Sequence, residues 1–448
     1  MKTKVQLANS YVVFRRKPRD EQSTRGRVAN RGSKELSLAL LLLLLMPGQT
    51  SAQQGRMEQG RITSSALTNN LYGDPATRNY SVYLPASYDT SAKRYPVVYF
   101  LHAWSYDESA LATRLQPTLD SMIRQRLIGE VIAVCPNAQN KLSGSWYVSS
   151  PVIGDYETYI AKDLVGWIDS HYRTLAVRES RGVTGWSAGG YGTMHLALKF
   201  PDVFSVAVPQ AGLYNSRSQL CDGLERGMAS YHPTNLTQVA ALPDWRMGAL
   251  EPLFAGLLPN PQRPSLYTDY VYDWVNNQAV LNASADQRCR QGDIQNGDLP
   301  RYLSQPVRLN GIKILHGTAD SVIPLTDPRQ FTNALGQAGV LFEYQEHSGG
   351  HEYRADLALP FLSSHLQDAE RYIKPPLLAL TLTTNAFQLA FPTQTNVQYT
   401  IESAAVLDAL GTNWVERAQV TGDLRTAKVT LPFQGGAAFF RVRAANVP

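Results

Sequence analysis

The sequence predicts an α/β protein with a central, mostly parallel sheet, an inserted cap region and a small all-β domain at the C-terminal end. Three observations support this fold class. Between about residues 79 and 372, short β-rich runs alternate with amphipathic segments, which is typical of a parallel sheet covered by helices. The alternation breaks once, between about residues 212 and 306. After Lys-Pro-Pro at 374–376, apolar and polar residues alternate with a period of two.

Seven runs are predicted to form strands of the main sheet, with helices between them. PVVYFLH (96–102) and EVIAVCP (130–136) are nearly continuous apolar runs, as expected of strands that are buried on both faces. The clearest helix, 156–172, places its apolar residues on one stripe. The predicted strands are 80–85, 96–102, 130–136, 182–186, 204–210, 312–317 and 340–346, and the other predicted helices are 190–200, 327–337 and 356–372.

The remaining regions predict separate structural units. Residues 212–306 are rich in Asn, Pro and Gly, with scattered aromatic residues. A structureless loop of about 95 residues would be exceptional, so a cap-like insert is predicted here. Residues 377–448 contain short alternating strands separated by turn residues, which indicates a β-sandwich. We therefore expect an N-terminal segment at 53–74, a main domain at 75–373 and an accessory domain at 377–448.

Residues 1–52 are predicted to be a signal peptide with a long basic leader. The leader precedes an apolar run of eleven residues, LSLALLLLLLM (36–46), which Pro47-Gly48 and small residues follow. A membrane-spanning helix needs about 20 apolar residues, so the run is short for a span. Cleavage is expected after Ala52, and the mature protein is expected to be secreted, either extracellular or periplasmic. The alternative is an uncleaved membrane anchor.

The charge of the chain argues against nucleic acid or a membrane surface as a partner. Ten of the 42 Lys and Arg residues and three of the 37 Asp and Glu residues lie in residues 1–52. The rest of the chain has 32 basic and 34 acidic residues and is close to neutral.

Cysteine usage leaves two alternatives open. Three cysteines allow at most one disulfide, which suits an exported protein. Cys221 and Cys289 could pair, or all three could be free thiols. Cys135 lies within the apolar run VIAVC and is expected to be a buried thiol.

The segment GWSAGG (185–190) predicts a serine nucleophile. It places Ser187 at the centre of G-x-S-x-G, after a predicted strand and before a predicted helix, as that motif requires. A nucleophile on a tight strand–turn–helix is held in a strained backbone conformation, so its close neighbours must be small. The helix start also supplies free N–H groups for a developing oxyanion.

A serine hydroxyl needs a base to take its proton and an acid to orient that base. In this arrangement the chain order is Ser, acid, His. Asp320 follows the end of the predicted strand 312–317, where a carboxylate can face the active edge of the sheet. Asp320 is therefore the expected acid.

Three histidines compete for the role of base. His347 and His351 are four residues apart, a spacing at which two histidines on a helix can bind a metal ion. Two glycines lie between them and would break a helix, and the residues around them do not match the metalloprotease motif H-E-x-x-H. His351 lies on a loop after a predicted strand, as an exposed base should, and is the predicted base. His347 is expected to be a supporting or surface residue, and His316, which precedes the acid, a structural one.

The oxyanion hole needs a second N–H group, from the loop after an early strand. The loop within YFLHAWSYDES (99–109) is the candidate. The amides of Ala188 and Trp104 are the two predicted donors. The alternative for Trp104 is a core or rim aromatic residue.

Four segments together resemble the esterase D / feruloyl esterase-like branch of the α/β-hydrolase superfamily. Relatives in that branch include acetylxylan and feruloyl esterases, S-formylglutathione hydrolases and the antigen 85 acyltransferases. The C-terminal region resembles β-sandwich modules appended to secreted bacterial hydrolases. The four segments are 78–109, GWSAGGYGTM (185–194), HGTADSVIP (316–324) and GGHEY (349–353).

The resemblance implies an α/β-hydrolase catalytic domain and a serine esterase, with Ser187 as nucleophile, Asp320 as acid and His351 as base. One departure concerns the oxyanion loop, because the family usually has His-Gly where this chain has His102-Ala103. A β-carbon there could tilt the oxyanion donor or narrow the acyl site.

We expect a secreted carboxylic-ester hydrolase that acts on carbohydrate-linked acetyl or feruloyl esters. No metal or organic cofactor is expected, because no ligand cluster and no phosphate-binding loop is evident. The alternatives are an acyltransferase, a serine peptidase of the same fold, or a non-catalytic carbohydrate-binding protein. The expected substrate-binding residues, with a core or rim position as the alternative for each, are Trp104, Tyr106, Trp146, Trp186 and Tyr214.

Overall fold

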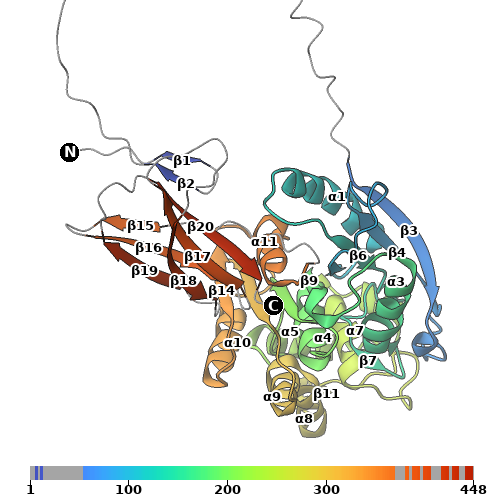
Figure 1. The fold of residues 1–448 in the computed structure, drawn as a ribbon. Coiled ribbons are helices and arrows are strands. Elements are labelled where there is room, and N and C mark those ends of the chain that lie inside the picture. The colour runs from blue at the N-terminus through green and yellow to red at the C-terminus, as the bar shows by residue number, and fades with distance from the viewer. Residues whose placement is uncertain are drawn as a thin grey trace, which may run out of the picture. The chain divides into compact units, whose positions relative to one another are not determined.

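The computed structural model describes the main domain and a set of strands near the two ends of the chain. The described residues are 6–8, 11–13, 54–368, 379–382, 386–393, 397–404, 415–422, 426–432 and 439–446. They belong to two compact units, Gln54–Tyr372 and a second unit made of Met1–Gln53 with Ile373–Pro448 (Figure 1). Apart from residues 6–8 and 11–13, the predicted signal region lies outside the described residues, as does the linker 374–376.

The main unit is built on an eight-stranded sheet with the strand order β14-β13-β10-β9-β5-β6-β4-β3. The strands from β14 to β6 pair in parallel, and β4 and β3 add an antiparallel edge. The predicted mostly parallel sheet is confirmed. The strands are β3 (Arg56–Thr63), β4 (Thr77–Leu84), β5 (Val97–Leu101), β6 (Ile132–Pro136), β9 (Arg181–Trp186), β10 (Val206–Gln210), β13 (Gly311–Gly317) and β14 (Glu343–His347).

The one strand of this sheet that the sequence did not predict is β3. Its sequence RMEQGRIT is mostly polar, and only Ile62 is buried. β3 lies at the edge of the sheet and pairs with β4 alone. An edge strand needs little apolar surface, so the pattern that identified the buried central strands is absent.

Two groups of helices cover the sheet, one on each face. Helices α1 (Glu108–Arg124) and α11 (Ala355–His365) pack in one apolar core with alternate residues of β5 and β6. Helices α3 (Val165–His171), α4 (Ala188–Lys199) and α10 (Thr326–Gln337) pack in a second, larger core. The central strands β5 and β6 are therefore buried on both faces, which explains their continuous apolar sequences.

The helices differ from prediction at three places. The predicted helix 156–172 consists of α2 (Tyr156–Thr158), a π-helical segment (Tyr159–Leu164) and α3. α11 ends at His365, earlier than predicted. α1 was not predicted; it contains Pro117, whose missing N–H and ring disfavour a helix interior.

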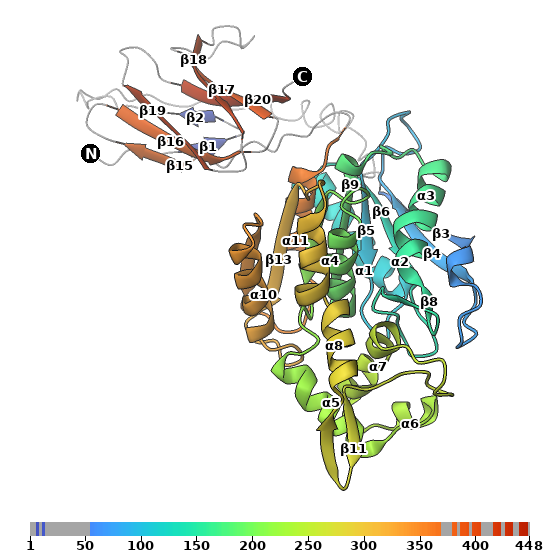
Figure 2. The ribbon, with the colours of Figure 1, turned by 90° about the horizontal axis from the view of Figure 1, so that it is seen from below.

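The inserted region folds into elements of its own, which Figure 2 shows gathered at one end of the main unit. Three of its α-helices have ten or more residues, and a short hairpin projects beyond them. The elements are α5 (Gln219–Tyr231), α6 (Leu236–Ala240), α7 (Trp245–Leu257), β11 (Tyr272–Val275), β12 (Gln278–Leu281), α8 (Ala283–Gly292), a π-helical segment (Ile294–Asp298) and α9 (Leu299–Ser304).

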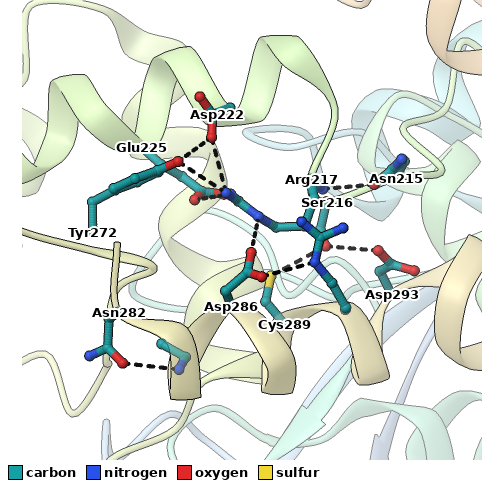
Figure 3. Close-up of polar contacts among 12 residues, drawn as sticks. Asn215, Ser216, Arg217, Asp222, Glu225, Tyr272, Asn282, Asp286, Cys289 and Asp293 are labelled. Atoms are coloured by element: carbon teal, nitrogen blue, oxygen red, sulfur yellow. Dashed lines mark hydrogen bonds and ion pairs between the residues drawn. The ribbon is translucent and has the colours of Figure 1, made fainter. Parts of the chain in front are cut away.

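A buried arginine holds the insert together (Figure 3). The Arg217 side chain is only 4% exposed and forms ion pairs with Asp222 (3.0 Å), Asp286 (2.6 Å) and Glu225. These carboxylates lie on α5 and α8, and the hydroxyl of Tyr272 from β11 also contacts the guanidinium. Arg217 thus joins two helices and the hairpin of the insert.

We predict that Arg217→Met lowers the free energy of unfolding by about 3 kcal/mol or more, because it removes the cation that contacts the buried Glu225. Burial is the main cause that raises the pKa of Glu225 to about 8, although Arg217 lowers it. Without Arg217 this pKa rises further, so the defect should grow as the pH rises from 7 to 9, where Glu225 ionises in the wild type but not in the variant. Urea unfolding at both pH values measures it.

The matched control for this substitution is Arg226→Met. Arg226 pairs with the same Asp222, but its side chain is 51% exposed, so its loss should cost far less than the loss of Arg217. Equal destabilisation by the two variants would contradict a special role for the buried arginine.

A buried imidazole joins α4 to the insert and to α2. His195 Nδ1 lies 2.6 Å from Asp298 Oδ2, and Nε2 lies 3.0 Å from Glu157 Oε1. Lys199 and Arg301 pair with the same two carboxylates. Burial opposes the charged imidazolium, but Asp298 and Glu157 outweigh it and raise the pKa of His195 to about 9. The ring is therefore held as a cation at neutral pH.

We predict that this contact makes stability depend on pH between 7 and 10. The pKa of His195 is raised in the folded chain, so its contribution is complete below about 6.5 and is lost as the pH rises through about 9. A shift of this size corresponds to roughly 3 kcal/mol. His195→Gln should remove this part of the pH dependence in urea unfolding, whereas His171→Gln, at an exposed position, should not. The prediction would be refuted if the free energy of unfolding changed with pH in the same way in wild type and in His195→Gln.

All three cysteines are free and buried, so the alternative of a Cys221–Cys289 disulfide is wrong. The Cys289 thiol donates a hydrogen bond to Ser216 Oγ over 3.2 Å. Cys135, on β6, is a buried thiol as predicted.

The described part of the second unit is all β, in agreement with the predicted C-terminal domain. Its strands form a five-stranded sheet in the order β1-β2-β20-β17-β18 and a three-stranded sheet in the order β15-β16-β19. A small apolar core includes Phe391, Tyr399 and Ile401. The strands are β1 (Gln6–Ala8), β2 (Tyr11–Val13), β15 (Ala379–Leu382), β16 (Ala386–Pro392), β17 (Val397–Ala404), β18 (Val415–Thr421), β19 (Thr426–Pro432) and β20 (Phe439–Asn446).

Candidate active site

Ser187 lies on a sharp turn between β9 and α4. Its backbone has φ 61° and ψ −120°, outside the regions that non-glycine residues favour. The Ser187 N–H donates a hydrogen bond to the carbonyl of Gln210, at the end of β10, over 3.0 Å. A strained conformation of this kind persists only where its surroundings hold it, and such residues cluster at functional sites.

The glycines of the motif allow three backbone segments to meet at this turn. A β-carbon on Gly185 would lie 2.5 Å from the carbonyl oxygen of Gly189. A β-carbon on Gly189 would lie 2.1 Å from the carbonyl oxygen of Leu101 and 2.9 Å from that of His102. Both positions are too close for any side chain, so the turn at Ser187 packs directly against the loop that follows β5.

Asp320 and His351 are in direct contact. Asp320 follows β13 and His351 follows β14, and these two strands are neighbours in the sheet. His351 Nδ1 lies 2.8 Å from Asp320 Oδ2, with the Asp320 side chain fully buried and that of His351 12% exposed. Because the carboxylate accepts from Nδ1–H, Nε2 is the nitrogen left to act as a base.

Two backbone amides also hold the carboxylate of Asp320. Its Oδ1 accepts hydrogen bonds from the amides of Val322 (2.8 Å) and Ile323 (2.9 Å). Burial alone would raise its pKa, but the hydrogen bond from His351 and these two amides outweigh burial, so the pKa of Asp320 lies below its ordinary value. The acid therefore stays ionised at neutral pH.

The other two histidines contact backbone groups, and His316 also approaches the Asp320 carboxylate. Burial lowers the pKa of His316, and its Nε2 donates to the Ile323 carbonyl over 3.0 Å and lies 3.3 Å from Asp320 Oδ2. His347 Nδ1 accepts from the Gly349 amide over 3.1 Å. Within the described residues no three His, Cys, Asp or Glu side chains are placed to hold a metal ion.

The loop after β5 is ordered around His102. The Ala138 amide donates to His102 Nε2 over 2.9 Å, so Nδ1 carries the proton and donates to the Ala103 carbonyl over 2.8 Å. Ala103 is buried and does not adopt a positive φ, so its β-carbon causes no backbone strain. Trp104 follows directly, and Ala188 is the first residue of α4, where no preceding turn accepts its N–H.

A family match covers most of the main unit of the chain. Residues 75–354 match the family model described as "Putative esterase". The chain belongs to this esterase family. The match confirms the resemblance to esterase-type α/β-hydrolases that the motifs indicated.

Curated relatives of the chain include an esterase and an endo-1,4-beta-xylanase/feruloyl esterase. The chain is 27% identical over 286 residues to Esterase Rv1288 from Mycobacterium tuberculosis H37Rv, a match that covers 62% of this chain and 53% of that protein. It is 26% identical over 154 residues to an endo-1,4-beta-xylanase/feruloyl esterase from Xylanibacter ruminicola, with 33% and 21% coverage. The chain spans about half the length, or less, of these two relatives.

Similar solved structures include a ferulic acid esterase and an S-formylglutathione hydrolase. The former shares 20% identity and a TM-score of 0.46 and covers 70% of this chain and 99% of its own. The latter, from Agrobacterium tumefaciens, shares 18% identity and a TM-score of 0.46 and covers 70% and 97%.

One aromatic side chain lies beside the candidate base, and a second packs against it. The Trp186 ring lies 5.7 Å from the His351 ring and 5.2 Å from that of Tyr106, measured between centroids. Tyr106 belongs to the same loop as Trp104. Both Trp186 and Tyr106 are only partly buried.

Two residues that the sequence suggested as substrate contacts lie in the core of the main unit. Trp146 is 5% exposed, and its Nε1–H donates to the Ala249 carbonyl over 2.7 Å. Tyr214 is fully buried and stacks on Phe331. Both belong to the packed interior, which corrects the expectation that they line the site.

One aromatic residue near this site was noted only among the scattered aromatics of the insert. Trp245, at the start of α7, stacks on Trp104 with ring centroids 5.9 Å apart and an angle of 19° between the planes. More than 140 residues separate the two in the sequence, and no local pattern signals their contact.

Proposed function

We propose that the chain is a secreted serine carboxylic-ester hydrolase that works through an acyl-enzyme intermediate. Ser187 is the nucleophile, His351 the base and Asp320 the acid. The observation that carries this proposal is the 2.8 Å contact between His351 Nδ1 and Asp320 Oδ2, at the same edge of the sheet as the strained turn of Ser187. The leader sequence supports secretion; none of the helices in the described part of the chain is long and apolar enough to cross a membrane.

The reaction has two steps. In the first, His351 Nε2 takes the proton of Ser187 Oγ as the oxygen bonds to the ester carbonyl carbon, and the amides of Ala188 and Trp104 stabilise the oxyanion. The carbon–oxygen bond to the alcohol then breaks, and His351 gives its proton to the leaving oxygen. In the second step, His351 deprotonates a water molecule that attacks the acyl-enzyme and releases the acid.

The proposed substrates are acetyl or feruloyl esters of carbohydrates. The partly buried aromatic rings of Trp104, Tyr106 and Trp186 supply apolar surface beside the proposed nucleophile. Secretion and the xylanase/feruloyl esterase among the relatives favour a plant-polysaccharide ester. The near-neutral charge of residues 53–448 favours no nucleic acid as a partner.

The direct test compares ester substrates on the purified protein. Acetyl, feruloyl and longer-chain esters of the same alcohol should reveal hydrolysis, and a fluorophosphonate should label wild type but not Ser187→Ala. A peptide substrate and an added acceptor sugar separate hydrolysis of esters from the alternatives. Absence of both hydrolysis and labelling would refute the proposal.

A further inference from the structure

Trp245 presents an exposed ring surface on a rigid support. Trp104, on which it stacks, is fixed by the hydrogen bond from its Nε1–H to the Leu142 carbonyl over 2.8 Å. Its ring also packs against Gly144, where an added β-carbon would lie 3.3 Å from Trp104 Cδ1. Trp245 itself is 53% exposed. Because Trp104 covers one side of the Trp245 ring, the exposed area includes the opposite side.

This surface adjoins the proposed active site. The loop after β5 touches the turn of Ser187, as the close approach of Gly189 to the carbonyls of Leu101 and His102 requires. Trp104 is only two residues beyond His102 in that loop. The insert therefore contacts the candidate oxyanion loop through Trp245, and a substrate part that leaves the site on this side meets the Trp245 ring.

A fixed pair of charged groups precedes and follows Trp245 in the chain. The Arg246 guanidinium forms a bidentate pair with the Asp244 carboxylate, with Nη2–Oδ2 2.6 Å and Nε–Oδ1 3.0 Å. The side chains of both residues are partly exposed, at 34% and 26%. Asp244 also accepts from the Arg246 amide as the N-cap of α7, which fixes its position. The residues on either side of Trp245 therefore offer a partly exposed donor and acceptor.

We propose that Trp245, with Asp244 and Arg246, binds a sugar ring in the alcohol part of the substrate. A sugar has an apolar C–H face that stacks on an indole and hydroxyl groups that pair with a carboxylate and a guanidinium. An acyl group would instead need an enclosed, mostly apolar pocket, and a half-exposed ring beside an ion pair does not supply one. The assignment rests on the proposed ester hydrolysis and specifies its alcohol part.

The test compares two esters with the same acyl group. Methyl ferulate and feruloylated arabinose form one pair, and methyl acetate and acetylated xylotriose form another. Trp245→Ala should lower kcat/KM for the sugar ester about 5- to 10-fold more than for the methyl ester, mainly through KM, which is the scale of one aromatic contact. Trp245→Phe should restore more than half of the difference.

The matched control is Tyr231→Ala, which removes a similarly exposed aromatic ring of the insert, 56% exposed. It should leave the ratio of kcat/KM for the sugar ester to kcat/KM for the methyl ester unchanged. Calorimetry with unesterified xylotriose adds a readout that needs no catalysis, and its affinity should fall in Trp245→Ala. The proposal would be overturned if Trp245→Ala lowered kcat/KM equally for both esters, or more for methyl ferulate than for the sugar ester. If wild type hydrolyses no ester, the proposed function fails, while xylotriose binding still decides whether Trp245 holds a sugar.

Discussion

Ser187→Ala is expected to lower kcat for ester hydrolysis by at least ~10³-fold, the scale on which loss of a triad member reduces a serine hydrolase. The alanine side chain has no oxygen to form the acyl-enzyme, while the oxyanion donors and the substrate contacts remain. KM should therefore change much less than kcat. Steady-state kinetics on the best ester found in the substrate screen measures both values.

The structure supplies a control for this substitution. Ser230→Ala removes a hydroxyl from the exposed end of α5, where it bonds only the nearby Gly227 carbonyl, and kcat should stay within twofold of wild type. Thermal unfolding should show that Ser187→Ala is folded, since no hydrogen bond of its side chain holds the turn together. Near-normal hydrolysis by folded Ser187→Ala would reject Ser187 as the nucleophile.

Asp320→Asn should have a comparable effect, about 10³- to 10⁴-fold on kcat, through the tautomer of His351. The asparagine oxygen can still accept from the amides of Val322 and Ile323, so the side chain keeps its place. Its NH₂ group then faces Nδ1 and donates to it. The proton moves to Nε2, and the imidazole loses the lone pair with which it would take the serine proton. Steady-state kinetics, with thermal unfolding as a check on folding, measures the effect.

Asp327→Asn is the matched control for this prediction. Asp327 is also a buried aspartate, but it accepts from the amide of Tyr214 and does not touch His351. Burial raises the pKa of Asp327 to about 7, so an uncharged replacement changes little at neutral pH. Hydrolysis by this variant should stay within a few-fold of wild type. Similar losses in the two variants would show that Asp320 acts through stability and not through His351.

The parts of the fold that the sequence predicted are those with a local cause. Strands such as β5 and β6 are buried on both faces, and this burial makes their sequences continuously apolar. The turn at Ser187 needs glycines because backbone segments meet there. This steric requirement fixes the motif G-x-S-x-G, from which the turn can be predicted. Edge strand β3 was not predicted because its sequence is mostly polar, and α1 was not predicted because it contains Pro117.

The sequence by itself determined the fold class, the order of the strands along the chain and the candidates Ser187, Asp320 and His351, since each follows from spacing or steric need within a few residues. Only the tertiary structure decided that Asp320 meets His351 at 2.8 Å, that Trp146 and Tyr214 are core residues, and that Trp245 stacks on Trp104. These are contacts between residues far apart in the chain, or depend on burial by such contacts. Periodicity and motif spacing report only on neighbours along the chain, so packing across the insert had to come from the folded structure.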